Sequence, residues 1–338
     1  MSFPRVAIII LNWNNWRDTI ECIESVSKII YPNYNIILID NGSSNDSVTQ
    51  IKYHFKGVCG ERKQFVSNLS EKYLKYTVLL TTSKVSESNQ MTPKLTSFIF
   101  LELHENLGFS EGNNIGILCS RDNLHPDYYL LLNNDVVVEQ NFLSVLVEAA
   151  EKNPHVGFVG PKTYYYDYNG LQDVIEFGGG MINFRRGLPV VLDHGRRDEC
   201  HSQKIAPVDY IQGSCILVKK NVIEEIGLLD PKYFFYWEDS DWCIRGKMNK
   251  WLSLYAPGSK IWHKGGMSSN GHKSRFSLFY FTRNRLVFMK KYSPKKRLIL
   301  FFLYYFGGEF LKTCVYYVFK GDFQSLQVYL KANIMGLI

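Results

Sequence analysis

Short apolar runs alternate with amphipathic stretches along the first part of the chain. Residues 6–11 form an unbroken apolar run, and residues 20–26 carry apolar side chains at helical spacing before Pro32. A second apolar run at 36–39 ends on Asp40. A strand, a helix and a second strand in this order predict a βαβ unit, because buried parallel strands read as continuous apolar runs. Ligands bind at the carboxyl ends of the strands in such sheets, and polar residues follow both runs here.

Strand and helix patterns continue through the middle of the chain. Further strands are predicted at 98–103, 128–132 and 211–218, and helices at 142–150 and 222–229. Residues 53–97 are polar, rich in Ser, Lys and Thr and weakly periodic, and we predict that they form an insertion on the sheet. The pattern as a whole predicts an α/β fold.

The composition narrows the class of protein without deciding its function. With 338 residues, 46% of them hydrophobic and 21% charged, the chain can form one large α/β domain with an appendage, and whole-chain disorder is excluded. A net charge of +7 fits nucleic acid, an anionic membrane or a phosphate-bearing substrate, and it selects none of them. The residues after the first strand contain neither the GxGxxG of a dehydrogenase nor the Gly-rich phosphate loop of a nucleotidyltransferase. The first apolar run is also too short for a signal peptide.

Three groups of residues have the chemistry of a metal and proton-transfer site. Residues 133–135, Asn-Asn-Asp, follow the strand at 128–132, and residues 238–241, Glu-Asp-Ser-Asp, follow an aromatic run. His263 comes shortly after a Pro-Gly turn. Carboxylate and amide oxygens favour Mg²⁺ or Mn²⁺, and an added imidazole favours Mn²⁺. Such an ion commonly serves a diphosphate, so a phosphate-bearing substrate is expected.

Each group also has a purely structural interpretation when it is taken alone. Asn-Asn-Asp after a strand is frequently only a turn, and a single His is more often a structural residue than a ligand. Asp40 is placed to cap the turn that follows its strand. We favour a structural role for Asp241, since Arg245 lies one helical turn later and can pair with it.

Taken together and in this order, the motifs resemble the inverting family 2 glycosyltransferases with the GT-A fold, in particular their rhamnosyltransferase-like subgroup. The matching segments are 8–14, 38–44, 105–109, 112–114, 131–135, 213–214, 227–230, 237–241 and 261–263. The ordered series is specific, although each motif alone is weak. The resemblance implies a GT-A glycosyltransferase domain over residues 1–290, followed by a helical segment over 291–338.

The resemblance also implies roles for individual residues. Asp239 matches the catalytic base, and His263 matches the downstream metal-binding His of the family. Asn133 and Asp135 occupy the outer positions of the family's Asp-x-Asp metal motif, with Asn in place of the first Asp. The residues implied in binding the nucleotide sugar are Asn12, Trp13, Asn14, Asp40, Asn106, Gly108, Asn114, Asn134 and Arg283.

Within that set, Asp40 is expected to meet the nucleotide base, and the loop at 12–14 to flank it. Arg283 or Arg285 is expected to hold the diphosphate or an acceptor phosphate, because guanidinium groups suit that geometry. A salt bridge within the helix is an equally good interpretation of this Arg pair.

The implied reaction is an inverting transfer of a sugar from a nucleotide-diphosphate donor to a hydroxyl of a saccharide or lipid-linked glycan. A divalent metal would neutralise charge on the leaving diphosphate, and a carboxylate would take the hydroxyl proton. The first expected donor is dTDP-rhamnose, and a UDP-hexose or UDP-galactofuranose is second; nucleic acid is not an expected partner. A non-catalytic module that binds nucleotide sugars or glycans on the same fold is the alternative. The joint presence of Asp135, Asp239 and His263 argues against it.

The last segment of the chain differs in composition from the rest. A basic cluster at 290–297 precedes apolar and aromatic runs at 298–306 and 310–319. Gly-Gly-Glu at 307–309 interrupts these runs, so we expect two short amphipathic helices instead of one membrane-spanning helix. We expect them to hold a cytoplasmic enzyme peripherally on the inner face of the cell membrane. A pair of helices that forms a homodimer is the alternative.

Overall fold

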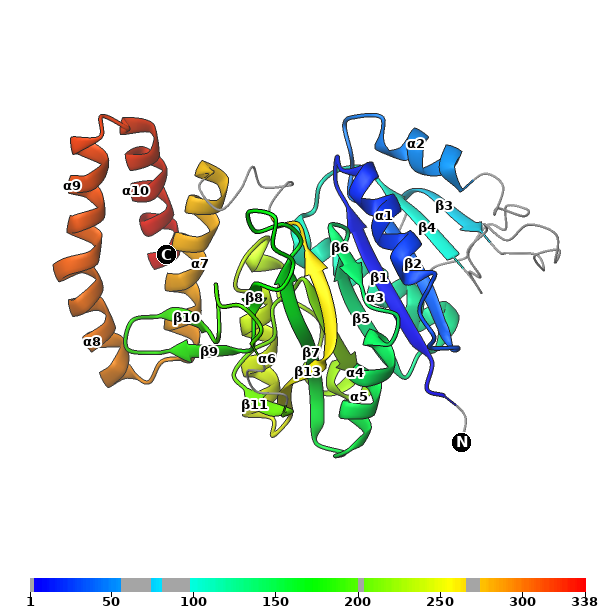
Figure 1. The fold of residues 1–338 in the computed structure, drawn as a ribbon. Helices are drawn as coiled ribbons and strands as arrows, with labels where there is room; N and C mark the ends of the chain where they lie inside the picture. The colour runs from blue at the N-terminus through cyan, green and yellow to red at the C-terminus, as the bar shows by residue number, and fades with distance from the viewer. Residues whose placement is uncertain (1–2, 56–73, 81–97, 200–203, 266–273) are drawn as a thin grey trace, which may run out of the picture.

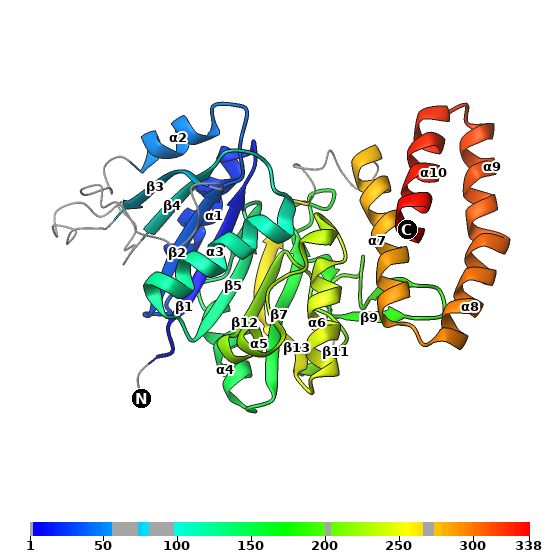
Figure 2. The same cartoon turned by 180° about the vertical axis from the view of Figure 1, so that it is seen from behind.

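The computed structural model describes residues 3–55, 74–80, 98–199, 204–265 and 274–338, with the backbone alone for 74–80. Of the 13 strands in the described chain, 11 form one large sheet and the other two form a separate hairpin. Helices cover both faces of the large sheet (Figures 1 and 2). The strands are β1 Val6–Asn12, β2 Tyr34–Asp40, β3 Leu74–Leu80, β4 Phe98–Leu103, β5 Tyr128–Asn133, β6 Val136–Val138, β7 Val156–Tyr165, β8 Ile175–Phe177, β9 Gly180–Asn183, β10 Leu188–Val191, β11 Ala206–Val208, β12 Cys215–Lys219 and β13 Leu252–His263.

The helices are interspersed with the strands in the first half of the chain, and they are consecutive in its last part. They are α1 Trp16–Val26, α2 Ser47–His54, α3 Gly108–Leu124, α4 Phe142–Glu151, α5 Lys220–Ile226, α6 Glu238–Met248, α7 Arg275–Tyr292, α8 Lys295–Tyr304, α9 Leu311–Phe319 and α10 Phe323–Leu337. A 3₁₀ turn, η1, covers Pro231–Tyr233, and a π-helical segment, η3, covers Tyr305–Phe310. The predicted α/β class is confirmed.

The order of strands in the sheet explains where the functional residues meet. The order is β11-β13-β7-β12-β5-β1-β2-β4-β3, with β6 and β8 paired to β13 and β7. Strands β4, β2, β1 and β5 are parallel, and β12 runs antiparallel between β5 and β7. In this register Asn12 lies beside Asp40, and Leu11 lies beside Asn133. Asn12, Asp40 and Asn133, which end β1, β2 and β5, therefore lie together at the carboxyl ends of these strands.

Each central strand is buried on both faces, which accounts for its continuous apolar run. On β1, Val6, Ile8 and Ile10 pack with helices α1, α2 and α4. Ala7 and Ile9 point to the opposite face, where α3, α5, α6 and α7 pack. All five side chains are fully buried. Alternation of side chains along a strand thus supplies two hydrophobic layers from one apolar run.

The structure differs from the expectation for part of the predicted insertion at 53–97. Residues 74–80 form β3, an edge strand antiparallel to β4. This strand extends the sheet, because its backbone pairs with the free edge of β4. Residues 56–73 and 81–97 lie outside the described part of the chain.

The expectation of two short helices in the last segment is wrong. Helix α8, segment η3 and helix α9 form one continuous helix from Lys295 to Phe319. Gly307 and Gly308 lie within its π-helical turn and do not end it. By length and composition alone, this helix is long enough and apolar enough to cross a membrane. Helix α10 returns beside α7, and both views show α8 and α9 at the outer margin of the molecule (Figures 1 and 2).

Candidate active site

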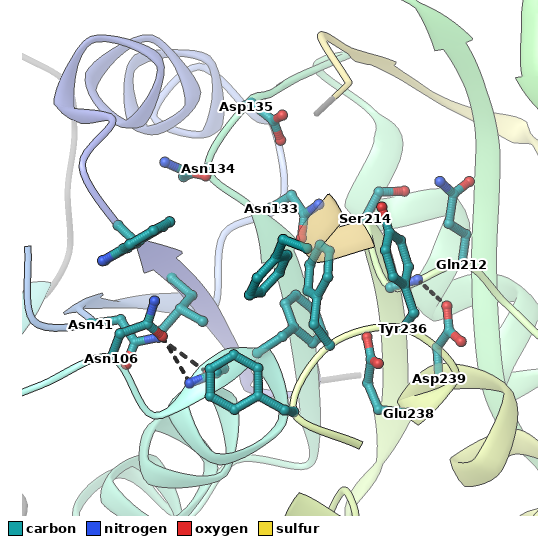
Figure 3. A pocket seen from close by; sticks show the side chains of 18 of the residues that line it. Asn41, Asn106, Asn133, Asn134, Asp135, Gln212, Ser214, Tyr236, Glu238 and Asp239 are labelled. Atoms are coloured by element: carbon teal, nitrogen blue, oxygen red, sulfur yellow. Dashed lines mark hydrogen bonds between the residues drawn. The ribbon is translucent and has the colours of Figure 1, made fainter. Parts of the chain in front are cut away.

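A cavity of about 220 Å³ opens where β1, β5 and β13 end, against the N-termini of α3 and α6. Its lining residues are Leu11, Trp13, Asn41, Asn106, Gly108, Phe109, Asn133, Asn134, Asp135, Gln212, Gly213, Ser214, Phe234, Phe235, Tyr236, Glu238, Asp239, His263 and Phe276. Figure 3 shows Asp135 at one end of this pocket and the pair Glu238 and Asp239 at the other. The predicted residues that line it are Trp13, Asn106, Gly108, Asn133, Asn134, Asp135, Asp239 and His263.

Three predicted nucleotide-binding residues instead support the loops beside the pocket. Asn12 donates from Nδ2 to Oδ1 of Asp40 over 2.7 Å, and both side chains are buried. Asp40 also accepts from the backbone N–H of Ser43 at 2.9 Å, so the capping interpretation of Asp40 is confirmed. Asn14 accepts from the backbone N–H of Ser44 at 2.9 Å. These residues join the loop after β1 to the loop after β2, and they do not line the cavity.

Asn114 and Arg283 are not brought to the pocket either. Asn114 exchanges two hydrogen bonds with the backbone of Leu229, at 2.9 and 3.1 Å, and so ties α3 to the loop after α5. Arg283 donates to the carbonyl oxygen of Lys232 at 2.7 Å. Arg285 pairs with Glu309 in the last segment. Both guanidinium groups of this motif thus have partners outside the cavity.

The floor of the pocket is a network of amides around Gly108. Asn41 donates from Nδ2 to Oδ1 of Asn106 at 3.0 Å and to the carbonyl oxygen of Gly108 at 3.1 Å. Gly108 has φ +81°, and a Cβ atom added there would lie 2.6 Å from the carbonyl oxygen of Phe234. Glycine is thus required both by the backbone conformation and by the close approach of the aromatic loop. The network fixes the start of α3 beneath the cavity.

We call the end of the pocket that contains Asp135 the metal end. A buried histidine lies there between two carboxylates. His263 places Nε2 3.2 Å from Oδ1 of Asp135 and Nδ1 2.8 Å from Oε2 of Glu176. Burial alone would lower the pKa of His263, but Glu176 and Asp135 together raise it well above its ordinary value. Burial would raise the pKa of Asp135, but the ion pair with His263 lowers it. The imidazolium therefore keeps Asp135 ionised.

These residues fit a divalent cation with few protein ligands. Across the described ranges, no cluster of three or more His, Cys, Asp or Glu side chains is arranged to hold a metal. Once a bound cation displaces the proton on Nε2 of His263, the imidazole and the Asp135 carboxylate would supply two ligands. The amide of Asn133 lines the same cavity. Glu176 holds the second ring nitrogen of His263, as carboxylates commonly do for metal-binding histidines. A hard cation bound this way keeps positions for the oxygens of a substrate diphosphate.

Sequence reasoning missed Glu176, although the same carboxylate orients the predicted ligand His263. Glu176 lies on the short strand β8, 87 residues before the histidine that it contacts. The pairing of β8 with β7, and of β7 with β13, brings them together. No local motif marks Glu176, so only the sheet topology reveals it.

At the other end of the pocket, which we call the base end, the buried Glu238 and the half-buried Asp239 are adjacent and have no ion pair within the described residues. Asp239 accepts from the backbone N–H of Gly213 at 2.9 Å, and also from the backbone N–H of Ser240. Among the described residues, Oε2 of Glu238 has no hydrogen-bond partner. Burial, and then repulsion from Asp239, raise the pKa of Glu238 well above its ordinary value. Burial also raises the pKa of Asp239, while the backbone donors oppose the rise.

These surroundings determine which of the two carboxyl groups is ionised and which is protonated. A carboxylate that accepts backbone N–H bonds at a helix N-terminus is favoured as an anion. A buried carboxyl group without partners is favoured as the neutral acid. We therefore assign the negative charge to Asp239 and the proton to Glu238. Glu238 was not among the residues predicted for the site, although it immediately precedes the predicted base.

The loop before α6 holds these carboxyl groups in place through a strained backbone. Three of its residues have positive φ, with 49° at Phe234, 66° at Tyr236 and 75° at Trp237. Asn284 of α7, which is fully buried, donates from Nδ2 to three carbonyl oxygens, at 2.7, 2.8 and 2.9 Å for Tyr233, Phe235 and Tyr236. Strained backbone persists where surrounding contacts fix it. Asn284, between the two arginines that the sequence singled out, makes those contacts.

The structural role expected for Asp241 is confirmed. Asp241 is fully buried and accepts from Nε of Arg245 at 2.8 Å, in the predicted i,i+4 pair. Lys291 of α7 also donates to it, at 2.7 Å. Asp241 thus fixes α6 against α7 and stands apart from the pocket-lining carboxyl groups.

Comparison with known proteins agrees with this fold. Residues 4–285 match the family described as "Glycosyltransferase like family 2", and the chain belongs to this family. Over 148 residues it is 26% identical to the low-salt glycan biosynthesis hexosyltransferase Agl10 of Haloferax volcanii, covering 44% of this chain and 46% of that protein. Over 154 residues it is 26% identical to an N-acetylglucosaminyl-diphospho-decaprenol L-rhamnosyltransferase of Mycobacterium tuberculosis, covering 40% of this chain and 47% of that protein. The chain therefore spans about half the length of these curated relatives.

Solved structures show the same fold at low sequence identity. A mannosyltransferase from Pyrobaculum calidifontis, in complex with GDP-Man and Mn²⁺, matches with a TM-score of 0.56 and 12% identity, over 98% of this chain and 74% of that one. GalNAc-T7 with UDP, GalNAc and Mn²⁺ matches with a TM-score of 0.61 and 14% identity, over 89% of this chain and 50% of that one. The predicted GT-A fold is confirmed.

Proposed function

We propose that this protein is an inverting glycosyltransferase that moves a sugar from a nucleotide-diphosphate donor to a hydroxyl group of a glycan. The observation that carries the proposal is the layout of one pocket, with the pair Asp135 and His263 at one end and the carboxyl group of Asp239 at the other. Sugar transfer needs this separation, because the leaving diphosphate and the attacking hydroxyl lie on opposite sides of the anomeric carbon. The membership of family 2 supports the same conclusion.

Asp239 acts as the general base in this proposal. Its carboxylate is held by the N–H groups of Gly213 and Ser240, which fix its direction and leave lone pairs for a hydroxyl proton. Glu238 remains protonated beside it, so a second negative charge does not oppose the developing anionic character of the acceptor oxygen. The step forms one C–O bond and breaks another with inversion, and it requires no nucleophile from the protein.

Asp135 and His263 hold the diphosphate end of the donor in this proposal, with the amide of Asn133 beside them. When bound, Mg²⁺ or Mn²⁺ would neutralise the charge that develops on the leaving nucleoside diphosphate. Glu176 orients the imidazole of His263 toward the pocket. With Asn at 133 in place of a carboxylate, the protein offers one negative charge fewer to the cation, so donor and cation are expected to bind together.

In this proposal, the donor and the acceptor are inferred from the names of the relatives. Trp13, Asn106, Gly108 and Asn134 line the nucleotide-sugar side of the cavity, and Asn12, Asn14 and Asp40 frame it from behind. We propose dTDP-rhamnose as the first donor to test and a UDP-sugar as the second, since relatives are named rhamnosyltransferases. The proposed acceptor is a saccharide or lipid-linked glycan, reached by a cytoplasmic enzyme with peripheral contact to the membrane through residues 291–338.

A panel of nucleotide sugars tests the proposal by thermal shift, with and without Mn²⁺. We expect one donor to raise the melting temperature in the presence of metal, and EDTA or Asp135→Ala to abolish the shift. Glu148→Ala is the matched control, because Glu148 is an exposed carboxylate on α4 away from the cavity. Stabilisation by every donor that persists in EDTA and in Asp135→Ala would contradict this role for the metal end. Absence of donor hydrolysis and of transfer to any acceptor would favour the non-catalytic alternative.

A further inference from the structure

The continuous helix of α8, η3 and α9 presents a long apolar surface that no described part of the chain covers. We name this surface the tail face and define it by Ile299, Leu300, Leu303, Leu311, Val315 and Phe319. Leu303 is 67% exposed, Val315 51% and Phe319 86%. An exposed apolar surface of this length usually marks a binding site for a protein or a membrane.

The opposite side of the same helix is fixed to the rest of the protein. Phe301 and Tyr305 are buried, and Tyr305 donates from its hydroxyl to Oδ1 of Asn333 on α10 at 2.8 Å. Phe301 also meets the tip of the β9–β10 hairpin, where a Cβ atom added to Gly187 would lie 2.8 Å from its ring. The helix is therefore docked along one side, and the tail face is left uncovered by the described residues.

A partly buried ion pair in the middle of the helix determines how the helix can meet a membrane. Glu309, in the π-helical segment, pairs with Arg285 of α7, and one of the contacts is 2.9 Å. The guanidinium group also lies over the ring of Tyr305, at 4.7 Å from the centroid. If the helix crossed a bilayer, this pair and part of α7 would have to enter the hydrocarbon or separate, and both are costly. The packing observed here instead allows the helix to lie in the plane of a membrane surface.

Basic side chains from two distant segments lie along α8, the first half of the helix. Lys295, Lys296 and Arg297 begin α8, and Arg185 and Arg186 form the tip of the β9–β10 hairpin. The guanidinium group of Arg186 lies 5.7 Å from the ring centroid of Tyr304, and its carbonyl oxygen accepts from Arg285. Figure 1 shows the hairpin reaching α8 across the gap from the sheet. We call these five side chains the basic end.

The charge of the whole segment agrees with an anionic partner. Residues 290–338 contain eight Lys or Arg and two Asp or Glu, so they carry an excess of six positive charges out of the chain's net +7. Anionic headgroups attract such segments from the adjacent water, and apolar side chains then insert at the boundary of the acyl chains. A parallel homodimer formed by the same face would bring two basic ends toward each other, at a cost in repulsion.

We propose that the tail face and the basic end dock on the surface of an anionic lipid bilayer, with the helix from Lys295 to Phe319 lying in the membrane plane. The proposal deepens the membrane location in the proposed function and rests on it. Its test measures lipid binding without turnover, so a failure here is distinct from a failure of the glycosyltransferase assignment. Point variants are used because deletion of the segment would uncover the buried Phe301 and Tyr305.

The experiment compares co-sedimentation of the full-length chain with vesicles of phosphatidylcholine alone and of phosphatidylcholine with phosphatidylglycerol. We expect binding to the anionic vesicles, weakened by raised salt because charges are screened. The double variant Leu303→Glu with Val315→Glu should lose about tenfold or more in vesicle affinity, since it places two charges in the apolar surface. Met248→Glu is the matched control, as Met248 is 71% exposed on α6 and outside the tail face, and it should bind as the wild type does.

A second variant and a mass measurement keep the proposal falsifiable. Arg186→Glu with Lys296→Glu should reduce binding to anionic vesicles and remove most of its dependence on salt. The melting temperature of each variant, with donor present, verifies that the fold is intact. Equal binding of wild type and both double variants would overturn the proposal. So would a full-length chain that ignores anionic vesicles but is a dimer by light scattering and becomes a monomer in Leu303→Glu with Val315→Glu.

Discussion

The surroundings at the two ends of the pocket shift the pKa values of their carboxyl groups in opposite directions. Asp135 lies beside the cationic ring of His263, and its pKa is lowered in spite of burial. Asp239 lies beside another carboxyl group, Glu238, and burial raises the pKa of both. A carboxylate paired with a cation is a weak base and a good ligand for a metal ion. A carboxyl group buried beside a second carboxyl group holds a proton more strongly. One pocket thus contains a group suited to bind metal and a group suited to accept a proton.

The largest expected effect comes from removing the base while its shape is kept. Asp239→Asn should reduce transfer by about 10²–10⁴, because the amide cannot take the hydroxyl proton. Donor binding should be nearly unchanged, since the metal end contains no residue altered by the substitution. Rates from product formation and donor affinity from thermal shift measure the two effects separately. Asp167→Asn, at an exposed carboxylate, is the control. Wild-type turnover in Asp239→Asn would remove this residue from the mechanism.

A smaller effect is expected when the support of the metal end is weakened and its ligands are kept. Glu176→Gln should lower the affinity for Mn²⁺ by about 10–100-fold, because the second ring nitrogen of His263 loses its carboxylate partner. Titration of free Mn²⁺ by electron paramagnetic resonance measures this affinity without turnover. Glu148→Gln should leave it unchanged, and Glu176→Asp should restore part of it. If Glu176→Gln binds Mn²⁺ as the wild type does, the carboxylate only fills space beside the histidine.

The fold could be predicted well where burial leaves a local pattern. The runs at 6–11, 36–39 and 128–132 are apolar throughout because each strand is covered on both faces, and all three became strands of the parallel core. The same logic placed polar residues at one edge of the sheet. It failed for the last segment, where Gly307 and Gly308 predicted a break. The helix continues because Glu309 pairs with Arg285 on another helix, and composition within a window cannot reveal such a pair.

The sequence predicted several residues that line the pocket, but it did not reveal Glu176 and Asn284, which hold the site in place. Asp135, His263 and Asp239 lie at strand ends or a helix start, and the structure brings all three to one cavity. Glu176 and Asn284 act through partners that are 87 and 48–51 residues away in the chain, so no spacing marks them. Chemistry that depends on a residue type at a strand end is visible in sequence. Chemistry that depends on which strands and helices are neighbours appears only in the fold.

The smallest expected effect concerns stability at the base end. In the folded chain the pKa of Glu238 lies well above its ordinary value of 4.5. The contribution of this group to the stability of the fold is therefore fully present below pH 4.5, and it is lost as the pH rises through the raised pKa. Glu238→Gln removes this loss, because the amide carries no charge to bury. The variant should therefore have a higher melting temperature than the wild type at neutral pH, with a difference that shrinks as the pH falls toward 4.5. Melting curves of both proteins across this range measure the trend. An equal difference at every pH would mean that Glu238 titrates normally, and the contrast between the two ends of the pocket would then rest on Asp239 alone.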